Sequence, residues 1–154
     1  MPLEQFAIIA LLTLLPGLEL RAGILFGLSQ GMDALQVFAL AVAVNALLGP
    51  IVLFALQNIL PFFLKINVLE KFYAQNVLRV QKDYKKYIEK YGGIGLALFI
   101  AVPLPGAGSW SGALAAFLMG MKIKKFAIVN FVGVLIAGII VTLAGLGIIS
   151  LFGL

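Results

Sequence analysis

Two side chains, Glu19 and Arg21, are the only charged groups between positions 5 and 32 of an otherwise apolar stretch. A carboxylate and a guanidinium at such a place either pair and lock the local structure or bind a ligand together. Residues two apart face away from each other on a helix but project to one side of an extended segment. In an unwound turn, Arg21 would then hold an anionic group while Glu19 exchanges protons, or the two would form a purely structural ion pair.

A second stretch with notable chemistry is "PLPGAGSWSG", residues 103–112. Its prolines interrupt the hydrogen-bond ladder of a helix and its glycines permit unusual backbone angles, so we expect a turn there. It has no charged side chain and supplies hydroxyl groups and an indole ring instead. Together the two stretches give the candidate substrate- or ion-binding residues Pro16, Gly17, Glu19, Arg21, Pro105, Gly106, Gly108, Ser109, Trp110 and Ser111.

Two asparagines complete the candidate site. Asn45 and Asn130 are the notable polar residues of two long apolar segments. They either line a polar pocket near the turns or hydrogen-bond neighbouring helices.

Other chemistries lack their residues. The "GSWSG" at 108–112 invites comparison with a nucleophile elbow, but Trp110 stands where that motif needs serine. The chain has no His and no Cys, and its six acidic residues are scattered. We therefore expect no enzyme activity, no metal, no cofactor and no nucleic-acid partner.

Composition indicates an integral membrane protein. Of 154 residues, 63% are hydrophobic and only 11% are charged, and the mean hydropathy is +1.15. A soluble core of this length cannot absorb so much apolar surface. The amino terminus does not read as a signal peptide, because Glu4 precedes the apolar run and no basic residue precedes Arg21.

The two halves of the chain are similar at an offset of 89 residues. Residues 15–17, Leu-Pro-Gly, fall on 104–106, and 13 of the 49 positions from 15 to 63 match without a gap. Small residues recur at intervals of four in both halves and predict a face for close helix packing. They are Gly23, Gly27 and Gly31, with the counterparts Gly112, Ala116 and Gly120.

The positive charges indicate how the chain crosses the membrane. Seven of the eleven Lys and Arg residues lie in the connector between the halves, and three more lie at 122–125. The positive-inside rule places both clusters in the cytoplasm, which requires residues 93–120 to enter the bilayer and turn back. Four simple crossings are the alternative, since each apolar block is long enough to span.

We therefore predict an all-α integral membrane protein with a single domain, 1–154. It is an inverted repeat of two units, 5–63 and 93–152, each a re-entrant helical hairpin followed by one transmembrane helix. A basic amphipathic helix, 64–92, joins them on the cytoplasmic side of the cell membrane together with Lys122–Lys125. Both termini would lie outside.

"LPGLELRAGI" and "PLPGAGSWSGALAAFLMGMKIKKF" resemble the two signature stretches of the small multi-drug export protein family. That family in turn resembles the DedA, or VTT-domain (SNARE-associated-like), superfamily. The resemblance implies two re-entrant hairpins that face each other and a role in membrane transport or lipid translocation. DedA proteins carry arginines in the second hairpin, whereas this chain has no arginine at 103–112 and carries Arg21 in the first hairpin.

Three functions follow as hypotheses. The first is a DedA-like transporter of an anionic amphiphile such as a lipid phosphate, either a polyprenyl phosphate or a phospholipid, coupled to protons or cations. The second is a cation-coupled exporter of small molecules or drugs, and the third is a membrane scaffold that transports nothing. The expected partners are membrane lipids, the substrate and a second copy of the chain, because two spanning helices are too few to shield two polar turns from lipid.

Overall fold

The computed structural model describes residues 3–63, 85–103 and 106–152, and this part of the chain is helical with short turns and no strand. The all-α class is thus confirmed. Most of the predicted amphipathic connector, and Pro105, lie outside the described residues. The helices are α1 (Leu3–Leu14), α2 (Glu19–Ser29), α3 (Ala34–Phe63), α6 (Lys85–Ala101), α7 (Ser109–Leu118) and α8 (Ile123–Phe152).

Two long helices form the frame. Residues Ala34–Ile59 of α3 and Ile123–Ile148 of α8 are each 26 residues long and apolar enough to cross a membrane. At 1.5 Å per residue each is about 39 Å long, more than the ~30 Å hydrocarbon core. With its composition, this makes the chain a membrane protein.

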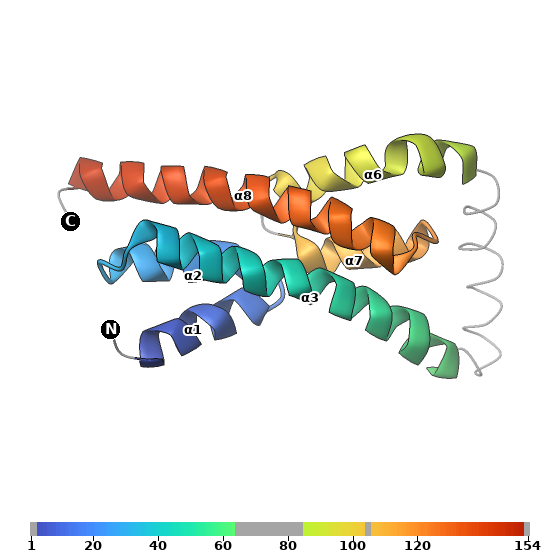
Figure 1. The fold of residues 1–154 in the computed structure, drawn as a ribbon, viewed down its shortest axis with the longest axis horizontal. Helices are drawn as coiled ribbons and strands as arrows, with labels where there is room; N and C mark the ends of the chain where they lie inside the picture. The colour runs from blue at the N-terminus through green and yellow to red at the C-terminus, as the bar shows by residue number, and fades with distance from the viewer. Residues whose placement is uncertain (1–2, 64–84, 104–105, 153–154) are drawn as a thin grey trace.

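Short helices fill the space beside them. The helices α1, α2 and α7 have 12, 11 and 10 residues, or about 15–18 Å each, which is half of a bilayer core. In Figure 1, α1 and α2 form a hairpin from one end of the molecule, and α6 and α7 form a hairpin from the other. The turns of the two hairpins meet near the middle of α3 and α8 (Figure 1).

The helix bounds and backbone angles recur at the 89-residue offset. The helix α3 covers residues 34–63 and α8 covers 123–152, so both ends are displaced by 89. Within the described residues, every backbone position with a positive φ has a counterpart 89 residues away that is also positive. These pairs are Gly17 and Gly106, Glu19 and Gly108, and Gly31 and Gly120.

Glycine ends the second limb of each hairpin. At the end of α2, the N–H of Gly31 donates to Leu28 O at 3.0 Å and that of Met32 donates to Gly27 O at 3.1 Å, the Schellman arrangement. The corresponding bonds from residues 120 and 121 end α7. No atom lies within 4 Å of a Cβ added at Gly31. The prediction that Gly31 belongs to a packing face was therefore wrong: Gly31 forms the left-handed turn after α2, and Gly120, with a φ of 64°, forms the equivalent turn after α7.

The other small residues do serve close packing. A Cβ on Gly27 would lie 2.6 Å from Val37 of α3, and one on Gly112 would lie 2.7 Å from Ile100 of α6. Where α3 and α8 approach each other, a Cβ on Gly49 would lie 2.6 Å from the Asn130 side chain. The missing side chains let the hairpins and the long helices come together around one core.

Candidate functional site at the hairpin turns

The carboxylate of Glu19 is buried against the start of α7. Glu19 is the first residue of α2 and is only 3% exposed. Its backbone φ angle is 50°. A positive φ is uncommon for a residue other than glycine and is a recurrent mark of functional positions. The surrounding contacts must therefore outweigh the cost of this backbone conformation.

Those contacts join Glu19 to the opposite hairpin. The backbone N–H of Ser109 donates to Glu19 Oε2 at 2.8 Å, and the N–H of Trp110 donates to Oε1 at 3.1 Å. Ser109 and Trp110 are the first two residues of α7, whose N-terminal N–H groups have no partner within the helix. Glu19 of the first hairpin thus caps the N-terminus of α7 in the second hairpin. A negative charge is favoured at this end of a helix.

Gly108 makes this approach possible. It precedes α7 and has a φ of 153°, and a Cβ at this position would overlap the carboxylate of Glu19. The equivalent position in the first half is Glu19 itself, 89 residues earlier. One half supplies the carboxylate and the other supplies the space for it.

Arg21 contacts the same hairpin through different atoms. Its Nη2 donates to Val102 O at 2.9 Å and also to Ala107 O, which lie on the two sides of the break between α6 and α7. Its Nε and Nη1 are buried and have no hydrogen-bond partner among the described residues. Within the described part of the chain Arg21 forms no ion pair with Glu19. The pairing, one of the two expected alternatives, is therefore not formed, and each residue separately contacts the opposite turn.

Trp110 performs the reciprocal contact. Its indole Nε1 donates to Leu14 O at 3.1 Å, the last carbonyl of α1. The orphan carbonyls at a helix end need such donors when the end is shielded from water. The breaks in both hairpins are therefore stabilised by side chains from the other hairpin.

Both asparagines lie at the site, with different roles. Asn45 Nδ2 donates to Glu19 Oε2 at 3.3 Å, whereas its Oδ1 is buried without a partner. Asn130 Nδ2 donates across to Ala46 O of α3 at 3.2 Å, and its Oδ1 accepts from Ser109 Oγ at 2.8 Å. The residues Asn45, Ser109 and Asn130 are all 0% exposed. Asn45 thus lines the site and Asn130 also bonds the two long helices together.

The remaining candidates that the structure describes lie in or beside the turns. Gly17 and Gly106 have φ angles of 81° and 86°, with no atom within 4 Å of an added Cβ. Pro16 is exposed in the first turn. Ser111 Oγ donates back to Gly108 O at 3.4 Å.

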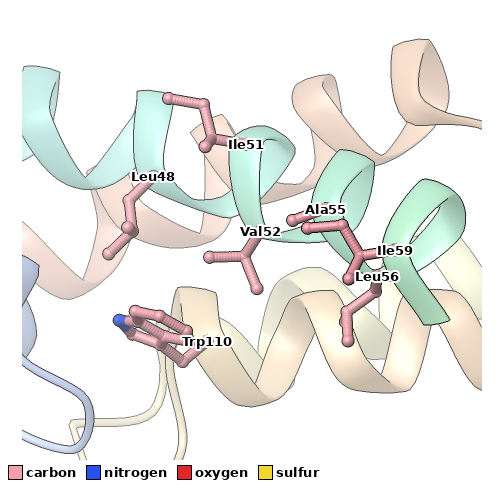
Figure 2. A pocket seen from close by; sticks show the side chains of 7 residues that line it. All are labelled: Leu48, Ile51, Val52, Ala55, Leu56, Ile59 and Trp110. Atoms are coloured by element: carbon pink, nitrogen blue, oxygen red, sulfur yellow. The ribbon is translucent and has the colours of Figure 1, made fainter. Parts of the chain in front are cut away.

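An apolar groove adjoins the site and was not predicted from the sequence. It has a volume of about 450 Å³ and runs between α3 and α7 (Figure 2). The ring of Trp110 lies at one end of the groove, and the backbone N–H of the same residue binds Glu19. The other lining residues come from α3: Leu48, Ile51, Val52, Ala55, Leu56 and Ile59. Their spacing is that of any buried face of a long apolar helix, so periodicity alone could not single them out.

The fold and site define an all-helical membrane protein built around two apolar helices of spanning length, with buried polar groups where short helices break. In a comparison with protein families, residues 19–140 match the family described as "Putative small multi-drug export protein". The match covers most of the chain, and the chain belongs to this family. No curated protein and no solved structure matches it. The expected relation to the DedA superfamily stays a prediction.

Proposed function

We propose that this protein is a membrane transporter that exports small amphipathic molecules. In this proposal α3 and α8 cross the bilayer, and the two hairpins enter it from opposite faces as halves of an inverted repeat. The half-bilayer lengths of α1, α2 and α7 support this placement, as does the 89-residue recurrence of the positive φ angles. Transporters place binding sites where broken helices meet at the midplane.

The basic residues support an orientation. The first residues of α6 and α8 lie at the same end of the molecule, and both chain termini lie at the other (Figure 1). Lys90 is near the start of α6, and Lys122, Lys124 and Lys125 flank the start of α8. By the positive-inside rule this end faces the cytoplasm, and the termini face the outside.

The single observation that carries the proposal is the capping of α7 by the buried carboxylate of Glu19. Charged groups at this depth in a membrane are costly and mark transport pathways. An ionised carboxylate binds both N–H groups, and charge-assisted hydrogen bonds are roughly twice as strong as neutral ones. Protonation of Glu19 would weaken this cap, release the first turn of α7 and change access to the neighbouring groove.

The groove supports the substrate class. Its wall is apolar, and its end is the ring of Trp110, which suits an apolar body with a delocalised positive charge. This favours the second hypothesis, a cation-coupled exporter of small molecules or drugs, with a proton carried by Glu19. The family name agrees with this class.

One observation favours the other substrate class, an anionic amphiphile such as a lipid phosphate, which we call the anionic candidate. In the described part of the chain, two buried nitrogen atoms of Arg21, Nε and Nη1, have no hydrogen-bond partner. The N–H groups of a guanidinium are suited to bind phosphate oxygens. For this candidate the ligand would lie against Arg21, beside the Glu19 cap.

Transport in proteoliposomes tests both candidates. With the purified protein and an imposed pH gradient, we expect movement of ethidium, a lipophilic cation, that is lost in Glu19→Gln and retained in Glu4→Gln. Glu4 is a matched control because it is exposed at the start of α1. The anionic candidate would be favoured by a different result. The wild type would then transport a fluorescent lipid phosphate but not ethidium, and Arg21→Leu would abolish that lipid transport. No transport of either probe by a folded protein would favour a scaffold.

A further inference from the structure

A second groove lies between α6 and α8, away from Glu19. It has a volume of about 330 Å³ and combines two lysines with an apolar wall. Its described lining residues are Lys90, Gly93, Ile94, Ala97, Lys125, Ile128, Val129 and Val132. Both charged side chains among these described residues are lysines, and the remainder are apolar or glycine.

Gly93 creates the hollow. A Cβ at this position would lie 3.4 Å from Val129 Cγ2 and 3.7 Å from Lys125 Cε. The stem of Lys125 therefore lies along the bare backbone of α6, on the side where Lys90 stands one helical turn earlier. The Nζ of Lys90 lies 4.9 Å from the centroid of the Tyr91 ring, which holds this ammonium group near the start of the groove.

The wall below the lysines is apolar and outward-facing. Ile94 is 66% exposed and Ile128 is 69% exposed, and Ile128 belongs to the membrane-spanning part of α8. In a membrane these side chains contact lipid tails. The groove thus has two lysines at one end and an apolar wall along a spanning helix. This combination is complementary to an anionic lipid, whereas a free anion would have no use for the apolar wall.

We propose that this groove binds an anionic phospholipid, with its phosphate between Lys90 and Lys125 and an acyl chain along Ile94, Ile128 and Val132. Basic pockets between transmembrane helices bind acidic headgroups, and lysine stems lie along apolar surface while their ammonium groups reach the interface. This site goes beyond the proposed transport function, because it lies on other helix faces and uses no residue of the Glu19 cap.

Native mass spectrometry of the full-length protein in detergent tests the headgroup contact. We expect phosphatidylglycerol to bind more tightly than phosphatidylcholine with the same chains. Each of Lys90→Gln and Lys125→Gln should weaken phosphatidylglycerol binding about fivefold. Lys124→Gln is the matched control: it is exposed and basic but does not line the groove, so binding should be unchanged. An equal loss with Lys124→Gln would overturn the proposal in favour of a diffuse charge effect.

A second pair of variants tests the apolar wall. Gly93→Leu fills the groove and should reduce phosphatidylglycerol binding at least tenfold, whereas Gly95→Leu should leave it unchanged because Gly95 has open space around it on the same helix. Unchanged binding in Gly93→Leu would contradict the proposal. Displacement of the lipid by millimolar inorganic phosphate would also contradict it, since it would show a free-anion site. Circular dichroism and gel filtration of each variant establish that it is folded.

Discussion

Arg21 and Trp110 occupy equivalent positions 89 residues apart and make reciprocal contacts. Arg21 Nη2 donates to Val102 O beyond the end of α6, and Trp110 Nε1 donates to Leu14 O at the end of α1. A guanidinium and an indole thus do the same structural work in the two halves: each provides an N–H group to a carbonyl that the helix break has left without a partner. The backbone geometry thus recurs at the two positions although the side chains differ.

Replacement of these donors should destabilise the protein unequally. Trp110→Phe removes one N–H donor and keeps most of the ring, so we expect a loss of about 1 kcal/mol in the free energy of unfolding. Arg21→Leu leaves two carbonyls without this donor, at Val102 and Ala107, and we expect a loss of about 2–3 kcal/mol. Thermal unfolding in detergent, followed by circular dichroism, gives the order. An equal or reversed order would contradict the contacts described.

Gly108 should tolerate no side chain. Its φ is 153° and an added Cβ would overlap the Glu19 carboxylate, so Gly108→Ala should lower stability by about 2 kcal/mol or more and displace the cap of α7. Gly106→Ala is the control for backbone strain alone, because its φ is also positive but its Cβ would meet no atom; a loss of about 1 kcal/mol is expected there. Similar melting temperatures for the two variants would argue against a close approach of Glu19.

The contact of Gly49 with Asn130 should show coupling. Gly49→Ala places a Cβ 2.6 Å from the Asn130 side chain and should cost about 1–3 kcal/mol through overpacking. Truncation of Asn130 to Ala removes the atoms that obstruct this Cβ. The double variant should therefore be more stable than the sum of the two single losses predicts, by about 1 kcal/mol. Additive losses would show that the two helices are farther apart at this point.

The sequence was informative where it contained interruptions. Proline and glycine predicted both turns, and the offset of 89 residues related Gly17 to Gly106 from the sequence alone. The sequence also drew attention to Glu19 and Arg21, because they are the only charged residues in a long apolar stretch. Which groups they contact depends on how the two hairpins approach each other. Residue types alone left two alternatives, an ion pair or joint binding of a ligand, and the ion pair is not formed among the described residues.

Other features depend on three-dimensional packing. Spacing by four could not distinguish the packing glycines Gly23 and Gly27 from Gly31, which turns the chain after α2. The two grooves likewise arise from the distances between helices and not from a sequence pattern. The homodimer that was expected from the small number of spanning helices stays a prediction, and light scattering of the detergent-solubilised protein measures it directly.

In the proposed topology, both hairpins enter the bilayer and return to the side from which they came. Because the chain has no cysteine, single cysteines can be introduced and labelled with a membrane-impermeant maleimide in cells and in inverted vesicles. We expect Glu4→Cys and Gln30→Cys to react from one side, and Lys90→Cys and Lys122→Cys to react from the other. Four simple crossings would instead place the two members of each pair on opposite sides, and labelling in that pattern would rule out the re-entrant hairpins.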